Sequence, residues 1–114
     1  MIALWRSPKS SKSRQALALL EESGAHVVVY KYLAEMPARH EIEQIAHKLG
    51  LPPSAMIRMG EKAYSEKELD MVESEDALLD AMAEAPILIE RPIAVKADRA
   101  VIGRPPEAVL SLLG

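Results

Sequence analysis

The sequence predicts a single α/β domain in which a small mixed sheet is flanked by helices. Three observations predict it. Residues 1–33 have the pattern of a strand, a helix and a second strand, residues 37–86 have the apolar spacing of helices, and residues 92–113 read as two strands followed by a helix. At 114 residues, the chain is long enough for one hydrophobic core and too short for two domains.

The opening segment has the features of a βαβ unit. "MIALW" reads as a short buried strand, and Ser10 or Ser11 can cap the helix that follows, which ends at Gly24. "HVVVYKYL", residues 26–33, is rich in β-branched and aromatic residues and predicts the second strand. Strands joined by a helix in this way are most often parallel, with a right-handed crossover.

The middle of the chain is expected to be helical. Residues 37–50 carry an apolar stripe at helical spacing and end at a glycine. Ser54 is expected to cap a short helix. Residues 65–68, "SEKE", have the spacing of a capping box, in which a serine and a glutamate each satisfy a free backbone N–H. Residues 74–86 predict one more helix.

The last part of the chain supplies the other half of the sheet. "RPIAVKADRAVIGRPPE" reads as two short strands around a polar turn, and "PPEAVLSLL" as a closing helix that begins with proline. The full order matches a thioredoxin-like (glutaredoxin-like) sandwich, a four-stranded mixed sheet flanked by helices with a helical insertion. Other small α/β folds share this order, so it is suggestive only. No repeat or linker interrupts residues 1–114, which we expect to form one domain.

Composition and charge argue against several classes of function. The formal net charge of -3 disfavours general attraction to nucleic acids or membrane surfaces. No apolar run approaches the roughly 20 residues that a membrane helix needs, and charged residues interrupt the start of the chain where a signal peptide needs an apolar run. A cytoplasmic protein is therefore expected. Because the sequence contains no cysteine, the chain as written has no disulfide and no catalytic thiol.

"SPKSSKSR", residues 7–14, is the leading candidate for a functional site. The first N–H groups of a helix have no partner within it, and the helix dipole places partial positive charge there. This end of a helix therefore stabilises an anion or an activated nucleophile, and Lys9, Lys12 and Arg14 add cationic charge. A cysteine at position 10 would have a lowered pKa. The sequence holds Ser10 instead, with no histidine nearby in sequence to act as its general base.

Three arginines stand out by their context. Arg58 follows "PPSAMI", Arg91 precedes Pro92, and Arg104 precedes two prolines. Arginine offers planar, permanently charged donors that suit a tetrahedral oxyanion. Each of them is, taken alone, more often a surface or ion-paired side chain, and sequence spacing does not bring the three together. An Arg-Pro step before a strand is also a candidate cis peptide bond, a form that about 5–6% of X–Pro bonds in folded proteins adopt.

Four segments make the chain resemble one known family. These are "SPKSSKSR", "AMIRMGEKAY", "PILIERPIAV" and "IGRPPEAVL", and together they are similar in order and spacing to the glutathione- and glutaredoxin-coupled arsenate reductases. The likeness covers essentially the whole chain and is greatest to the short members, which end just after the last helix. It implies a thioredoxin-like fold in which three arginines surround one catalytic cysteine.

The resemblance also implies roles for individual residues. The catalytic cysteine falls on Ser10, in a Pro-x-Cys motif that begins at Pro8 and continues into the serine-rich helix start at Ser11. The family's cis proline falls on Pro92. The oxyanion-binding arginines fall on Arg58, Arg91 and Arg104.

In that family the thiolate attacks arsenate bound by the arginines, glutathione forms a mixed adduct with the arsenic, and glutaredoxin resolves it and releases arsenite. The resemblance therefore implies an oxidoreductase that acts on arsenate or a similar oxyanion, with glutathione and glutaredoxin as reductants and no bound cofactor. We expect a monomer. We expect no metal site, because His40 and His47 lack the i,i+4 spacing of convergent ligands.

The chain departs from the family pattern at the nucleophile and just before it. Oxygen has neither the low pKa nor the redox cycle of sulfur, so Ser10 removes thiol–arsenic chemistry from the chain as written. Either a cysteine was exchanged for serine by design, which the near-isosteric swap favours, or a natural member has lost its thiol and only binds. Arg6 and Ser7 stand where better-known members carry histidine and asparagine, and Arg6 can supply positive charge itself.

A non-catalytic function is the alternative. The fold also resembles that of thiol-stress regulators that bind RNA polymerase, which carry Cys-x-x-Cys where this chain has Ser10 and Ser13. Such a chain would be an interaction protein rather than an enzyme. The segment "IGRPPE" disfavours this alternative, because it matches the reductases and the regulators generally lack it.

Overall fold

The structure, a computed structural model, describes residues 1–113, which form two compact units. The sheet unit comprises Met1–Glu35 and the segment that starts at Arg91, and the helical unit comprises Met36–Glu90. Arg58 lies in the helical unit, and the other residues predicted for the functional site lie in the sheet unit. The single domain that the sequence predicts stays a prediction.

The sheet unit is built on the mixed sheet that the sequence predicts. Within residues 1–113 the strands are β1 (Ile2–Trp5), β2 (Val27–Tyr30), β3 (Ile93–Lys96) and β4 (Arg99–Ile102), in the spatial order β2-β1-β3-β4. β1 and β2 are parallel and are joined by α1 (Ser11–Glu22), whereas β3 is antiparallel to both β1 and β4. The predicted βαβ unit and closing hairpin are confirmed.

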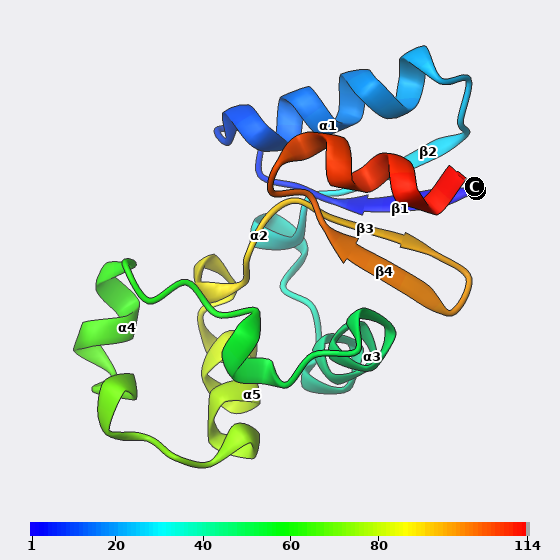
Figure 1. The fold of residues 1–114 in the computed structure, drawn as a ribbon. Coiled ribbons are helices and arrows are strands. Elements are labelled where there is room, and N and C mark those ends of the chain that lie inside the picture. The colour runs from blue at the N-terminus through cyan, green and yellow to red at the C-terminus, as the bar shows by residue number, and fades with distance from the viewer. Residues whose placement is uncertain (114) are drawn as a thin grey trace. The chain divides into compact units, whose positions relative to one another are not determined.

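One face of this sheet is covered by α1 and by the last helix, η4 (Pro106–Leu113), which lie side by side on it (Figure 1). Successive strand side chains point to opposite faces, so alternate residues of β1 enter this core. The buried cluster comprises Ile2, Leu4, Ala16, Leu20, Ala94, Val109 and Leu112. The predicted opening strand and the helix that follows it therefore pack against each other through apolar side chains.

The closing helix is present as predicted, although as a 3-10 helix. Helix ends leave carbonyl groups without a partner in the helix. Here the carbonyl oxygen of Leu112 accepts hydrogen bonds from Lys96 Nζ at 3.1 Å and from Arg99 Nη2 at 3.3 Å. Two cations of the β3–β4 hairpin therefore stabilise the end of η4.

The strand that follows α1 is shorter than predicted. β2 ends at Tyr30, because Tyr32 opens the short helix α2 (Tyr32–Glu35) and is entirely buried. The single tryptophan, Trp5, has its ring centroid 4.9 Å from that of Tyr30 and 6.0 Å from that of Tyr32. The burial of Tyr32 and its ring contact with Trp5 favour a short helix here, where β-propensity alone predicts that the strand continues.

The helical unit confirms the predicted helical middle. Its elements are α3 (Arg39–Leu49), η1 (Pro53–Ala55), α4 (Lys62–Glu66), η2 (Leu69–Met71), α5 (Glu75–Glu84) and η3 (Pro86–Leu88). As predicted, α3 stops at Gly50, whose φ of 69° is a left-handed conformation that glycine adopts without steric cost. Within residues 1–113, no helix is both long and apolar enough to cross a membrane.

Ion pairs join α3 to α5. Arg39 Nε donates to Asp80 Oδ1 at 2.6 Å, and its Nη2 donates to Asp76 Oδ1 at 3.1 Å. The hydrogen bond to Asp80 is the main reason that the pKa of Arg39 lies above its usual value. Arg39 is therefore a permanent positive charge held between two carboxylates of the neighbouring helix.

Two predicted helix caps are wrong. Ser54 lies inside η1, where its backbone N–H and its hydroxyl donate to the carboxylate of Glu75 at 2.8 and 2.7 Å. Ser65 lies inside α4, whose N-cap is Glu61, and Glu68 adopts a left-handed φ of 53° after the helix has ended. Neither serine precedes a helix, so neither is in a position to cap one.

Candidate anion-binding site

The loop between β1 and α1 is folded back onto the first turn of the helix. Ser7 is almost fully buried; its N–H donates to the hydroxyl of the buried Ser13 at 3.2 Å, and its carbonyl oxygen accepts from Ser10 N at 3.0 Å. Arg14 Nη1 adds a hydrogen bond to the carbonyl oxygen of Pro8 at 2.9 Å. These three bonds fix the backbone of residues 7–10 at the start of α1.

Ser10 is the N-cap of α1, as predicted. Its backbone is extended, with φ −84° and ψ 122°, and its hydroxyl accepts a hydrogen bond from Ser13 N at 3.2 Å. α1 is 12 residues long and has no acidic residue in its first turn. A side chain at position 10 therefore lies at the positive end of the helix dipole, where a negative charge is stabilised.

Arg91 and Arg104 flank the β3–β4 hairpin. Arg91 and Pro92 come just before β3, Arg104 comes two residues after the end of β4, and both Arg91–Pro92 and Arg104–Pro105 are cis peptide bonds. Arg104 Nε donates to the carbonyl oxygen of Arg91 at 2.9 Å. The hairpin thus places the two arginines, 13 residues apart in sequence, next to each other.

Strand register brings these arginines to the same end of the sheet as the β1–α1 loop. Trp5, the last residue of β1, pairs with Ile93, the first residue of β3, and Ile93 pairs with Ile102, the last residue of β4. The residues after β1, before β3 and after β4 therefore leave the sheet at one end. The sheet unit gathers the predicted residues Arg6, Pro8, Ser10, Ser11, Arg91, Pro92 and Arg104 there.

Gly103 is a residue of this end that sequence reasoning did not single out. A Cβ on Gly103 would lie 2.7 Å from Cγ of Pro92 and 3.1 Å from Cγ1 of Val109, so only glycine fits without a shift. Its N–H donates to the carbonyl oxygen of Pro92 at 2.8 Å. Gly103 allows the segments that carry Arg91 and Arg104 to approach closely. A glycine directly before the Arg-Pro step was the signal that could have revealed it.

Arg6 follows β1 and contributes a buried donor. Its backbone N–H donates to the carbonyl oxygen of Tyr30 at 3.0 Å, which continues the pairing of β1 with β2 by one residue. Its side-chain Nε is buried and has no hydrogen-bond partner within the described part of the chain. A buried donor without a partner costs about 1–3 kcal/mol, so this N–H favours a ligand that accepts a hydrogen bond.

Arg58 has a different environment in the helical unit. Its Nε donates to Glu61 Oε1 at 3.0 Å and its Nη1 donates to Glu90 Oε1 at 2.9 Å. All three side chains are partly buried. The third predicted arginine is thus ion-paired, and neither carboxylate was identified from the sequence as its partner.

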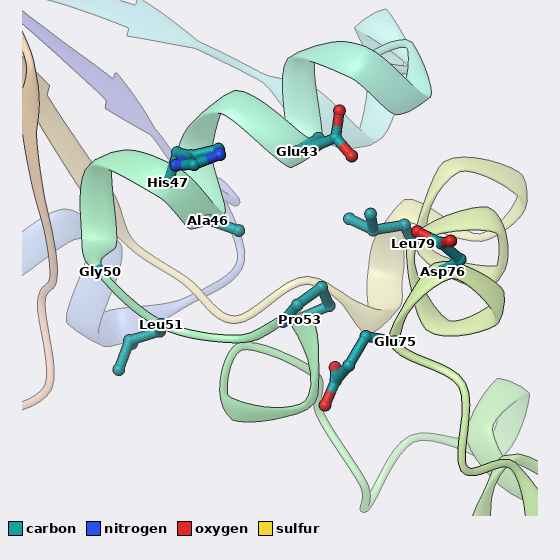
Figure 2. A pocket seen from close by; sticks show the side chains of 9 residues that line it. All are labelled: Glu43, Ala46, His47, Gly50, Leu51, Pro53, Glu75, Asp76 and Leu79. Atoms are coloured by element: carbon teal, nitrogen blue, oxygen red, sulfur yellow. The ribbon is translucent and has the colours of Figure 1, made fainter.

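The helical unit also contains a groove of about 310 Å³ in which no predicted site residue takes part. Figure 2 shows its lining residues, Glu43, Ala46, His47, Gly50, Leu51, Pro53, Glu75, Asp76 and Leu79. Two of its carboxylates already have partners, because Glu75 accepts from Ser54 and Asp76 from Arg39. The chemistry expected from the sequence therefore does not point to this groove.

Comparison with known proteins identifies relatives over nearly the whole chain. Residues 5–112 match the model of the ArsC family. The "Arsenate reductase" of Haemophilus influenzae is 40% identical over 114 residues, which cover 98% of this chain and 98% of that protein. The "Arsenate reductase" of Neisseria meningitidis serogroup A is 42% identical over 98% of this chain and 97% of its own.

A solved structure agrees with these sequence relatives. The arsenate reductase from Vibrio cholerae has a TM-score of 0.93 to this chain at 46% sequence identity, covering 96% of this chain and 95% of that one. The fold and length of the relatives are thus those of the chain itself. The predicted resemblance is confirmed: the protein belongs to the ArsC family and has its thioredoxin-like α/β fold.

Proposed function

We propose that this protein binds arsenate, or an oxyanion of the same shape and charge, at the N-terminus of α1. The observation that carries the proposal is the strand register, which gathers the β1–α1 loop, Arg91 and Arg104 at one end of the sheet. Helix N–H groups and guanidinium groups are the donors that tetrahedral anions prefer. The arsenate reductases among the relatives point to the same ligand.

The buried Nε of Arg6 supports the same ligand. An oxyanion oxygen placed near this N–H would satisfy a donor that has no partner within the described residues. Arg104 and Arg91 are assigned to the oxygens of the anion, and Ser10 and Ser11 to the helix mouth. Pro8, Pro92 and Gly103 shape the backbone around it. Arg58 is assigned as the third arginine by family resemblance.

The proposed reaction needs sulfur at position 10. A thiolate there would attack arsenic(V) and displace one arsenate oxygen as water. The thiol of glutathione would displace a second oxygen and join the adduct. A glutaredoxin thiolate would then attack the glutathione sulfur and form a mixed disulfide, and the electron pair of the broken sulfur–arsenic bond would reduce the arsenic to arsenic(III). Water would finally displace the thiolate at position 10 from arsenic(III) and release arsenite. Glutathione and glutaredoxin thus act as reductants, and a cytoplasmic monomer without a bound cofactor fits this chemistry.

The chain as written supports only the binding half of this reaction. The hydroxyl of Ser10 already serves as a helix cap, and an alkoxide lacks the redox cycle of a thiolate. Both explanations of Ser10, a designed exchange and a natural loss, predict a folded protein that binds the anion. The codon at position 10 in the source gene distinguishes them.

A titration with arsenate, sulfate and phosphate tests the proposal. Fluorescence of Trp5, the single tryptophan, follows binding next to the loop, and thermal unfolding measures the stabilisation. At ten times Kd an anion should stabilise the native state by about 1.4 kcal/mol. Arg91→Ala and Arg104→Ala should each abolish most of this gain. The matched control is Arg99→Ala, which removes the same charge at the other end of β4.

Restoring the thiol tests the catalytic half. Ser10→Cys should reduce arsenate in the presence of glutathione and glutaredoxin, and the unaltered chain should not. A folded Ser10→Cys protein that binds arsenate without turnover would disprove the reductase activity and leave anion binding intact. Absence of any anion-induced stabilisation would disprove both.

A further inference from the structure

The environment of Arg58 suggests how its access to an anion is controlled. Its guanidinium is held by two different carboxylates, Glu61 and Glu90, at 3.0 and 2.9 Å. The exposed fractions of the three side chains are 25%, 21% and 24%, so water screens these ion pairs only in part. One positive charge therefore lies between two negative charges in a partly dry environment.

The backbone prearranges this cluster. Ile57 pairs with Ile89 in an antiparallel bridge, Arg58 N donates to the carbonyl oxygen of Leu88 at 2.7 Å, and Glu90 N donates to that of Met56 at 2.8 Å. Arg58 and Glu90 are thereby neighbours, although 32 residues separate them in sequence. Glu61 lies three residues after Arg58 and reaches the other side of the guanidinium. Main-chain pairing therefore places Glu90 beside Arg58, and closeness in sequence places Glu61 there.

The two glutamates accept from donors of Arg58 that an oxyanion would also use. A guanidinium grips an oxyanion with two parallel N–H groups, either Nε with one Nη or the two Nη together. Glu61 accepts from Nε, which carries one hydrogen and belongs to the first fork, whereas Glu90 accepts from Nη1, which carries two hydrogens. An oxyanion that binds through the fork of Nε must therefore displace Glu61, and Glu90 competes with it for the charge of the same guanidinium.

We infer that Glu61 and Glu90 are positioning residues that hold Arg58 in a resting ion-paired state and lower the oxyanion affinity of the protein. An oxyanion that binds Arg58 must compete with these carboxylates for its guanidinium. The inference rests on the proposed function, in which Arg58 is one of the anion-binding arginines. It adds that this arginine is engaged in competition with the protein's own carboxylates.

Sulfate affinity of single variants tests this competition. Glu61→Gln and Glu90→Gln each remove one competitor without removing its bulk, and each should tighten sulfate binding by roughly three- to tenfold, the range expected for a partly screened ion pair. Glu90→Asp keeps the charge and should return the affinity toward that of the unaltered protein. Glu84→Gln, which removes a carboxylate paired with Lys67 in the same unit, is the control and should leave the affinity unchanged.

A double-variant cycle tests whether the gain passes through Arg58. In an Arg58→Ala background, Glu90→Gln should no longer tighten sulfate binding. A gain that persists without Arg58 would show that removal of negative charge alone acts on the anion, and would overturn the inference. Equal sulfate affinity of the unaltered protein and both glutamine variants would overturn it as well.

A measurement on the unaltered protein avoids variants that fail to fold. In NMR spectra, the Nε–Hε resonance of Arg58 should shift on saturation with sulfate. Either this N–H exchanges the carboxylate of Glu61 for the anion, or the nearby carboxylate of Glu90 leaves the guanidinium. Sulfate that binds without moving this resonance would overturn the inference but leave the proposed function standing. Absence of sulfate binding in the unaltered protein would overturn both.

Discussion

The sheet unit and the helical unit carry opposite charge. The sheet unit holds nine lysines and arginines against five aspartates and glutamates, a formal charge of +4. The helical unit holds five against twelve, a formal charge of -7. The net charge of -3 is the sum of the two and conceals the contrast. An anion site in an acidic protein is therefore less surprising than the whole-chain charge suggests.

Several cations of the two units also differ in the contacts that they make within their own unit. In the helical unit, Arg39, Arg58 and Lys67 pair with carboxylates. In the sheet unit, Arg99 and Arg104 donate to main-chain carbonyl oxygens. A carbonyl oxygen carries only partial charge, so such a bond neutralises less of a guanidinium than a carboxylate does. Arg39 and Lys67 thus join helices of their own unit, whereas Arg99 and Arg104 contact the main chain of theirs.

Substitutions of one glycine from each unit should show the largest difference. Gly103→Ala forces a Cβ to within 2.7 Å of the buried Pro92 ring, whereas a Cβ on Gly60 meets nothing within 4 Å. Overpacking of this kind costs about 1–3 kcal/mol, so urea unfolding should give a loss of that size for Gly103→Ala and almost none for Gly60→Ala. Equal stability of the two variants would contradict the close approach at Pro92.

Removal of one arginine from each unit should separate binding from stability. Arg104→Ala should weaken sulfate binding about tenfold, because a charge-assisted hydrogen bond is lost. Arg39→Ala should leave sulfate binding unchanged but lower the stability in low salt, because the contacts of α3 with Asp76 and Asp80 disappear. Added sodium chloride should shrink that loss. Calorimetric titration and urea unfolding measure the two effects.

Two helices begin with a serine cap, but only α1 is proposed to bind an anion at that end, whereas α5 is not. Ser10 accepts from Ser13 N at 3.2 Å in the sheet unit, and Ser74 accepts from Ala77 N at 3.3 Å in the helical unit. Either change to alanine should cost about 1 kcal/mol. Saturating sulfate should reduce the loss of unfolding free energy in Ser10→Ala but not in Ser74→Ala. The anion can accept a hydrogen bond from Ser13 N–H, which has lost its capping hydroxyl. An unchanged deficit would place the anion away from α1.

The order of elements could be predicted from the sequence because its signals are local. Apolar spacing located the main helices, and Gly24 and Gly50 mark helix ends with the positive φ that glycine favours. Contacts with residues far away in the sequence could not be predicted, and their absence from the pattern led to wrong cap assignments. Ser54 read as a cap because nothing in its neighbourhood reveals that its donors go to Glu75.

The candidate site could be predicted only in part, for the same reason. Arg91 and Arg104 were identified by their Arg-Pro context, but strand register, which spacing does not reveal, brings them to the β1–α1 loop. Glu61 lies within reach of Arg58 on sequence grounds, three residues away. Glu90 becomes its partner only through the pairing of distant segments, so no local pattern could have revealed it.

The smallest difference is expected between two lysines. Lys67 pairs with Glu84 at 2.8 Å, but 33% and 67% of the two side chains are exposed, so Lys67→Ala should cost below about 0.5 kcal/mol and less in high salt. Lys96 instead donates to the carbonyl oxygen of Leu112 at the end of η4, in a partly buried contact. Lys96→Ala should lower the free energy of unfolding by about 0.5 kcal/mol more than Lys67→Ala does, because the carbonyl loses a donor where water has less access. Added salt should reduce this loss less than it reduces the loss in Lys67→Ala. Urea unfolding at two salt concentrations measures both. A larger loss of stability in Lys67→Ala would contradict this expectation. It would mean that the exposed ion pair of the helical unit stabilises the fold more than the hydrogen bond from Lys96 to the carbonyl oxygen of Leu112 does.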